Sequence, residues 1–207
     1  MMLIDHLKWR YATKQFDPSK KITEEQLNRL KEAVQLTPSS FGLQPFKVLV
    51  TNNDALKASL VEATNNQVKV SQSSHLFIFC VEKQVTKEAV EQHVHRTAKA
   101  NNVTTESLAT FESYVKSKVI GWDEDFTLQW SAKQAYMAMT NLLNACAESK
   151  IDACPIEGFS PQRYIEILDL TTLTPVVVVA VGYRAKEDHN QFRTKTRKSL
   201  EELFIEI

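Results

Sequence analysis

The stretch CPIEGF at residues 154–159 contains the residue types with the most specific chemical potential in this chain. Proline fixes φ and lacks an N–H, whereas glycine allows a ligand to approach the backbone closely. Because the 207 residues include only four glycines, Gly158 is informative. The segment Ile156-Glu157-Gly158 is therefore a candidate for presenting backbone donors to the edge of a flat ring. The alternative interpretation is a tight turn at the exit of a helix, which is the commoner role of such residues.

Basic residues gather in two other stretches, one near each end of the chain. Arg10 and Lys14 lie four residues apart at the end of a short helical pattern. They share a face if that helix continues, and they frame its exit if it ends between them. The tail contains Arg193, Lys195, Arg197 and Lys198. By themselves such side chains are ordinarily solvated surface cations.

Familiar catalytic motifs are missing from the sequence. It contains no GxGxxG, GxxxxGK[ST], GxSxG or HExxH pattern. The three cysteines form no CxxC pair, so we expect reduced thiols and a cytoplasmic protein. His93 and His95 are two residues apart in a helical pattern, so they point to different faces and do not predict a metal site. The residues alone therefore identify neither a nucleophile nor a metal.

Hydrophobic periodicity predicts the helices that position these residues. Thr23 and Gln26 form a capping-box pattern at the start of a helix that ends before Pro38. A longer helix, from about residue 128 to 148, is apolar nearly all round, which indicates a central helix or one buried by a partner chain. Further helical stretches are predicted at residues 54–63 and 86–121.

Short apolar runs predict three buried strands, at residues 46–50, 76–81 and 176–181. Strands that alternate with helices predict an α+β fold with helix, sheet and helix layers. No repeat or change of composition divides the chain, so we expect one domain over residues 1–207. Its tail, residues 183–207, cannot fill a core of its own and looks like an arm that packs on something else.

Composition and charge exclude several classes of partner. The chain is 43% hydrophobic and 24% charged, which is typical of a soluble globular protein. Its 25 basic residues balance 25 acidic ones, so we expect no nucleic-acid or anionic-membrane partner. No apolar run approaches the roughly 18 residues of a membrane span, and the charged N-terminal segment is unlike a signal peptide.

Five segments together resemble the oxygen-insensitive, FMN-dependent nitroreductases and the related NAD(P)H-flavin reductases. The segments, in the family's order and with similar spacing, are RYATKQFD (10–17), TPSSFGLQP (37–45), WSAKQAY (130–136), PIEGF (155–159) and KTR (195–197). The resemblance covers essentially the whole chain. It implies a nitroreductase-like three-layer helix-sheet-helix sandwich in a domain-swapped homodimer. Residues 183–207 would then pack on the partner subunit, with two FMN sites at the interface.

The resemblance also implies which residues bind the cofactor. It assigns the FMN phosphate, which carries a charge of about −1.5 to −2, to Arg10, Lys195 and Arg197. The pyrimidine edge of the flavin, where positive charge stabilises the reduced form, is assigned to Lys14, Asn66 and Lys69. Backbone N–H groups of Glu157 and Gly158 are assigned to N5 and O4 of the ring. The other implied cofactor-binding residues are Tyr11, Ala12, Gly42, Pro155 and Ile156, together with Pro38, Ser39 and Ser40 of the second chain.

The implied activity is hydride transfer from NAD(P)H through flavin N5 to a nitroaromatic, a quinone or a similar flat acceptor. Nicotinamide and acceptor take turns in one pocket, which is a ping-pong mechanism, and no side chain need act as an acid or base. The expected substrate-contacting groups are Phe41 and either Phe111 or Tyr114 of the region 103–126, because their apolar faces suit a flat acceptor. Core packing is the alternative interpretation for each of these three side chains.

The chain departs from the family at three places. Tyr11-Ala12 stands where the family often has His-Ser or Arg-Ser, and Phe41-Gly42 replaces a more polar Thr-Asn pair. The region 103–126 matches poorly, which leaves the natural acceptor open. A protein that stores or senses FMN without turnover would share the same motifs, so this different class of function stays open as well.

Overall fold

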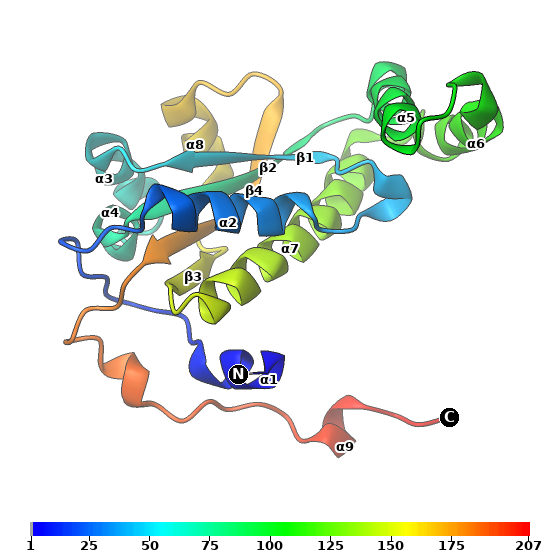
Figure 1. Cartoon of the computed structure of the whole chain (residues 1–207). Coiled ribbons are helices and arrows are strands. Elements are labelled where there is room, and N and C mark those ends of the chain that lie inside the picture. Colours follow the sequence, from blue (N-terminus) through cyan, green and yellow to red (C-terminus); the bar gives the residue numbers. More distant parts are fainter. Residues whose placement is uncertain (1) are drawn as a thin grey trace.

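A four-stranded antiparallel sheet forms the centre of the computed structural model, which describes residues 2–207 (Figure 1). The strands lie in the order β1 (Phe46–Thr51), β2 (His75–Glu82), β4 (Leu173–Gly182) and β3 (Asp152–Ile156). Each neighbouring pair is antiparallel. The inner strands β2 and β4 are buried along most of their length. Their unbroken apolar runs are explained by this central position, because both faces of the sheet are covered.

Each inner strand divides its side chains between two helical layers, because successive residues of a strand point to opposite faces. Phe77 and Val179 belong to the core beneath α2 (Glu24–Gln35) and α7 (Glu124–Glu148). Ile78 and Val178 belong to the core on the other face. That second face is covered by the helices α3 (Asp54–Ala63), α4 (Lys69–Gln72) and α8 (Pro161–Leu168). The predicted α+β fold with helix, sheet and helix layers is thus confirmed.

Two sequence predictions about helix ends have different outcomes. The capping box is confirmed, since the Gln26 N–H donates to Thr23 Oγ1 and the Thr23 N–H donates to Gln26 Oε1. The continuous helical stretch at 86–121 is wrong. Asn102 adopts a left-handed φ of 54° and ends the first helix there. The stretch comprises α5 (Lys87–Asn101), the 3₁₀ turn η2 (Glu106–Leu108) and α6 (Ala109–Val119).

The prediction of three strands is also wrong, because the sheet includes β3. Cys154, Pro155 and Ile156 lie in this strand and do not form the helix-exit turn considered from the sequence. A proline in the middle of a five-residue segment argues against a strand. It is tolerated here because β3 is at the edge of the sheet, where a missing N–H need not interrupt pairing with a second neighbour.

The remaining helices and the tail lie outside the two layers that cover the sheet. Helices α5 and α6 project together from one end, whereas α1 (Leu3–Trp9) and the tail lie on another side (Figure 1). The tail contains the short turns η3 (His189–Phe192) and α9 (Leu200–Leu203). Beyond these, Phe204 is 62% exposed and Ile205 is 89% exposed. None of the helices within residues 2–207 is long and apolar enough to cross a membrane.

Candidate functional site

A cavity of about 480 Å³ lies between the segment around the end of α1 and the tail. Five of the residues that line it are basic: Lys8, Arg10, Arg193, Lys195 and Arg197. No acidic residue of the described chain lines it. We call this cavity the cation pocket. Two stretches that are almost the whole sequence apart come together to form it, so its charge is created by the tertiary fold.

Burial and the mutual repulsion of positive charges lower the pKa values of two side chains in the cation pocket. The pKa of Arg10 is lowered by burial and by the charge of Arg197. The pKa of Lys195 is lowered by burial and by Arg10 and Arg197. Within the part of the chain that the structure describes, Arg10, Lys195 and Arg197 form no salt bridge with a carboxylate. A bound anion is the group that would relieve this repulsion.

Lys195 has a second role, because its ammonium group caps the end of α1. Its Nζ donates to the backbone carbonyls of Leu7, of Lys8 (3.2 Å) and of Arg10 (2.5 Å). The last carbonyls of a helix have no partner within it and carry partial negative charge. All three donors of the ammonium are therefore used, and Lys195 ties the tail to α1. The guanidinium groups of Arg10 and Arg197 keep donors for a ligand.

Asp188, which the sequence did not single out, joins the two walls of the cation pocket. It is 1% exposed and lies just before η3. Its Oδ2 accepts hydrogen bonds from the backbone N–H groups of Lys14 (2.8 Å) and Gln15 (3.3 Å) and from the Tyr11 hydroxyl (3.0 Å). Its Oδ1 accepts from the Asn190 backbone and side chain. One carboxylate thus fixes residues 11–15 against the start of the tail.

These bonds set the charge of Asp188. Burial by itself would raise the pKa of this carboxyl, but donors from Lys14, Asn190 and Tyr11 outweigh burial and lower it. The same contact, together with burial, raises the pKa of the Tyr11 hydroxyl above its usual range. At neutral pH the carboxylate is therefore charged and the phenol is neutral. That is the combination in which every donor finds an acceptor.

A second buried carboxylate also helps to fix the segment that contains Arg10. Asp152 in β3 accepts hydrogen bonds from the backbone N–H and the Nε–H of Arg184, each at 2.8 Å. The Arg184 guanidinium lies 4.6 Å from the ring centres of both Trp9 and Tyr11. Because these aromatic residues flank Arg10 in sequence, the sandwich fixes the backbone that carries it.

The candidate ring-binding backbone follows directly after β3. Glu157 and Gly158 are exposed, and their N–H groups donate to no acceptor in the described residues. The Gly158 carbonyl accepts from Asn65 Nδ2 at 3.1 Å and from Gln67 Nε2 at 2.8 Å. The segment is therefore held through its carbonyl, and two donors remain open. Its neighbours Pro155 and Ile156 are half-buried and buried, respectively.

The loop at residues 65–67 is therefore a neighbour of Gly158, through Asn65 and Gln67. Asn66 lies between them, exposed and with a left-handed φ of 57°. Lys14 is exposed next to the residues that Asp188 fixes. Lys69, at the start of α4, is 7% exposed. A continuous link from the cation pocket to this loop is made by Ala12, which pairs with Ala153 of β3.

The loop at residues 38–42 lies elsewhere in the chain. The Ser40 N–H donates to Gln134 Oε1 on α7 at 2.9 Å, and Ser39 Oγ accepts from the Gln44 N–H at 2.8 Å. Pro38 precedes them and is exposed. Ser39 thus fixes the loop through its hydroxyl oxygen, and Ser40 does so through its backbone N–H.

The three aromatic residues expected to contact substrate do come together. Phe41, Phe111 and Tyr114 gather where α5 and α6 pack over the 38–42 loop. The rings of Phe41 and Tyr114 are 6.1 Å apart and meet edge to face. Phe111 packs against the core of this region, while Tyr114 is 53% exposed. The group therefore combines a packed base with an accessible edge.

Helix α7 separates the loop at 38–42 from the ring-binding backbone within one chain. Ser40 contacts this helix through Gln134, whereas the Glu157 carboxylate accepts a hydrogen bond from the Tyr136 hydroxyl at 2.7 Å. Burial and this hydrogen bond raise the pKa of Tyr136 to about 12. Residues two apart on an α-helix point about 200° apart, and the helix is roughly 10 Å wide. The two groups consequently lie on opposite sides of α7.

Comparison with known proteins gives consistent results. The model of the Nitroreductase family matches residues 7–183. A protein of Staphylococcus haemolyticus with the provisional name NAD(P)H nitroreductase is 32% identical over 209 residues, which cover 96% of each chain. A solved structure from Staphylococcus epidermidis, provisionally named an NAD(P)H:FMN oxidoreductase, has a TM-score of 0.89 at 20% identity and covers 100% of this chain and 96% of that one.

A further solved structure is that of a nitroreductase of Exiguobacterium sibiricum in complex with FMN, again provisionally named. It has a TM-score of 0.84 at 18% identity and covers 100% of this chain and 98% of the other. At this identity the structural likeness shows the fold. The nitroreductase-like fold predicted from five sequence segments is confirmed.

Replacing Asp188 by Asn should loosen the cation pocket and destabilise the protein. A hydrogen bond to a charged group contributes about 1.5–3 kcal/mol, so we expect a loss of that order in the free energy of unfolding at pH 7. The pKa of Asp188 is lowered in the folded state. Its contribution to the free energy of unfolding is therefore fully present above the unfolded-state pKa of about 3.9, and it is lost as the pH falls through the folded-state pKa. Urea unfolding at pH 7 and at lower pH measures the difference.

The matched control is Glu187→Gln, which removes the adjacent exposed carboxylate. It should change the free energy of unfolding by less than about 0.5 kcal/mol. The role assigned to Asp188 would be contradicted if the two substitutions had equal effects on the free energy of unfolding. It would also be contradicted if the difference in this free energy between Asp188→Asn and wild type did not narrow below about pH 4.

Proposed function

Because this chain belongs to the nitroreductase family, we propose that it is an FMN-dependent oxidoreductase that uses NAD(P)H to reduce a flat acceptor. The acceptor class is a nitroaromatic, a quinone or a similar conjugated molecule. When bound, FMN supplies the hydride chemistry, accepting hydride from NAD(P)H at N5 and passing it on. The observation that carries the proposal is the cation pocket, whose charges have no carboxylate partner among the described residues.

In this proposal the cation pocket holds the phosphate of FMN. A phosphate with two or more acceptor oxygens matches the forked donors of Arg10 and Arg197. Lys195 contributes its charge and, through the carbonyls at the end of α1, the position of the tail. Tyr11 and Ala12 line the same cavity, so their backbone accompanies the phosphate.

The ring of the cofactor would lie along the end of β3. Ala12 pairs with Ala153, and Glu157 follows four residues later, about 13 Å along an extended strand. That length separates a phosphate at the cation pocket from a ring at the open N–H groups of Glu157 and Gly158. Lys14 and Asn66, with Lys69 behind them, would face the pyrimidine edge.

We further propose that the site is completed by a second copy of the chain. Within one chain α7 stands between the ring-binding backbone and the 38–42 loop, which supports the proposal that Pro38, Ser39, Ser40 and Gly42 act on the ligand of the partner subunit. A homodimer in which the loop of one subunit faces β3 of the other removes this obstacle. Residues 183–207 would act as the arm, since apolar side chains such as Phe204 and Ile205 are exposed.

The same dimer brings the aromatic group to the open face of the ring. Phe41, Phe111 and Tyr114 would then contact the nicotinamide and the acceptor in turn. Cys80, Cys146 and Cys154 are all free and buried, which suits the reducing cytoplasm that we propose for this protein.

Replacement of Arg197 by Ala should weaken FMN binding by about ten- to a hundredfold, since a charged phosphate contact contributes roughly 1.5–3 kcal/mol. Flavin fluorescence titration of the stripped protein measures the dissociation constant. Lys198→Ala is the matched control, because it removes the neighbouring cation, which does not line the cation pocket. If Arg197→Ala binds FMN as wild type does, the phosphate site is not in this pocket.

Deletion of residues 199–207 should convert the dimer into monomers and release FMN. Among residues 2–207, the deleted segment forms hydrogen bonds only within itself, so the body of each subunit should stay folded. Gel filtration with light scattering gives the mass, absorbance at visible wavelengths gives the flavin content, and circular dichroism checks the fold. A truncated protein that remains dimeric and yellow would exclude the arm as the link between subunits.

Steady-state kinetics should show a ping-pong pattern, because one pocket must serve both nicotinamide and acceptor. Varying NAD(P)H at several fixed concentrations of menadione should give parallel double-reciprocal lines. Intersecting lines would indicate a ternary complex and two separate positions. Tight FMN binding with no NAD(P)H oxidation in the presence of quinones or nitroaromatics would instead favour a protein that stores or senses flavin.

A further inference from the structure

The 3₁₀ turn η1 (Ser40–Gly42), which carries Phe41, has a backbone that needs external support. Phe41 has a φ of 57° and Gly42 a φ of 71°, both in the left-handed region. Glycine adopts this region readily, whereas a residue with a bulky side chain rarely does. The conformation of Phe41 therefore persists only because neighbouring groups hold it in place.

His93 of α5 is in direct contact with this turn. A Cβ atom built on Gly42 would lie 3.0 Å from His93 Cε1 and 3.3 Å from Nε2, so the imidazole fills the space where a side chain would be. The other side of the imidazole faces α6, where its ring centre is 6.2 Å from that of Phe111. His93 is thus wedged between the backbone that carries Phe41 and a second member of the aromatic group.

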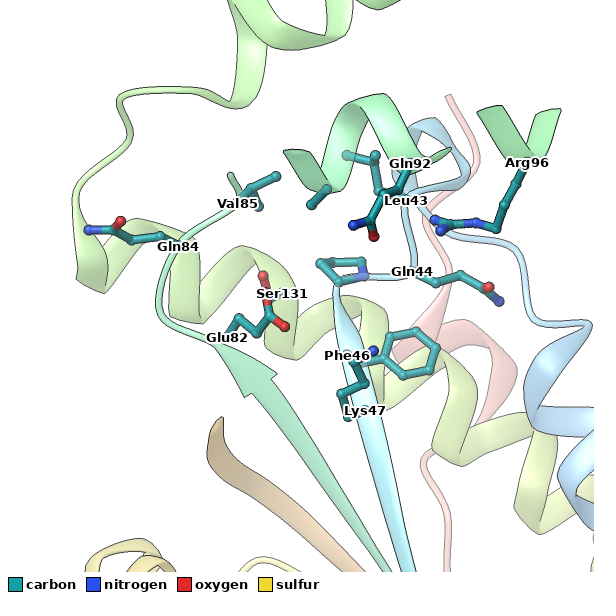
Figure 2. Close-up of a pocket in the computed structure, with 12 residues that line it drawn as sticks. Leu43, Gln44, Phe46, Lys47, Glu82, Gln84, Val85, Gln92, Arg96 and Ser131 are labelled. Carbon is teal, nitrogen blue, oxygen red and sulfur yellow. The ribbon is translucent and has the colours of Figure 1, made fainter. Parts of the chain in front are cut away.

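Packing next to the turn is otherwise incomplete. A cavity of about 130 Å³ is lined by Leu43 and Gln44, which follow the turn, and by Gln92 and Arg96 of α5 (Figure 2). The long side chains of Gln92 and Arg96 extend toward the Leu43–Gln44 segment in this view (Figure 2). Because part of this space is empty, the segment that follows the turn has room to shift if the support from His93 is removed.

The imidazole fills its place as an uncharged group. The pKa of His93 is lowered by burial and by the nearby charge of Arg96, and a hydrogen bond with the Phe41 backbone offsets part of this lowering. Its neutral form therefore predominates at pH 7. The uncharged ring therefore supports the turn by packing against Gly42 and by its hydrogen bond with the Phe41 backbone.

We infer that His93 is a positioning residue that holds Phe41 against the acceptor pocket and thereby sets the size of acceptor that the enzyme prefers. The inference rests on the proposed function, because it concerns the acceptor side of that same site. Selectivity between acceptors is then set partly by a residue on α5 that packs beneath the turn and acts only through it.

The test compares the specificity constants for menadione, which has two fused rings, and p-benzoquinone, which has one. His93→Ala should shift the ratio of kcat/KM toward menadione by about tenfold, the order expected for a change of one contact in an apolar pocket. FMN affinity should stay within about twofold of wild type. His95→Ala is the matched control: it removes the exposed imidazole two residues along α5 and should leave the ratio unchanged.

A double-mutant cycle with Phe41→Ala distinguishes positioning from a general structural effect. In the Phe41→Ala background, His93→Ala should produce no further shift in the ratio. An unchanged ratio in the single His93→Ala variant, or an equal shift in both backgrounds, would overturn the inference. If His93→Ala unfolds, His93→Gln, which keeps more of the volume, serves in the same cycle and should give a smaller shift of the same sign.

One further measurement does not depend on turnover. A crystal structure of the His93→Ala variant should show Phe41 displaced from its left-handed conformation. A wild-type protein that reduces no acceptor would contradict the proposed function, whereas Phe41 retained at a φ near 57° in the variant would contradict the role of His93 alone.

Discussion

Repulsion among Arg10, Lys195 and Arg197 is the constraint on which the functional end of this protein depends. The chain brings these charges together without providing a carboxylate beside them among the described residues. Such an arrangement is unfavourable in itself and must be held by other contacts. The carbonyls at the end of α1 hold Lys195, and the Asp188 carboxylate holds residues 11–15. In the proposed site, a bound anion would relieve this repulsion.

The sheet explains why these contacts converge. Edge strand β3 leaves one side open, and Ala12 pairs there with Ala153. Asp152 in the same strand fixes Arg184, whose guanidinium lies between Trp9 and Tyr11. A short strand that contains a proline is a poor stabilising element, but its outer edge is free to pair with Ala12. The same strand connects this contact, next to the cation pocket, with the open N–H groups of Glu157 and Gly158.

Helix α7 gives the protein its second organising feature. Because it contacts Ser40 on one side and Glu157 on the other, a single subunit displays half of a site on each side of the helix. In the proposed homodimer, a partner subunit would bring two such halves together. The aromatic group near Phe41 belongs to the half that the partner would receive, so in this proposal acceptor selectivity and cofactor binding are controlled by separate parts of each chain.

The sequence by itself determined the helices α2, α3 and α7, the three longer strands and the family. Local rules suffice for the Thr23 capping box and for the apolar runs of β2 and β4, because neighbouring residues carry the signal. It did not determine β3, because Pro155 contradicts strand propensity and is tolerated only at an edge that the tertiary fold creates. The break at Asn102 depends on a left-handed conformation that periodicity does not reveal.

Only the tertiary structure identified Asp188, Gln134 and His93. Asp188 acts on residues more than 170 positions away, so no local pattern reports it. Gln134 and Tyr136 look like successive members of one motif, and the helix turns them to opposite sides. His93 matters because a distant glycine leaves space for its ring. Sequence patterns record what each segment prefers, whereas the contacts that decide a site depend on which segments the fold places side by side.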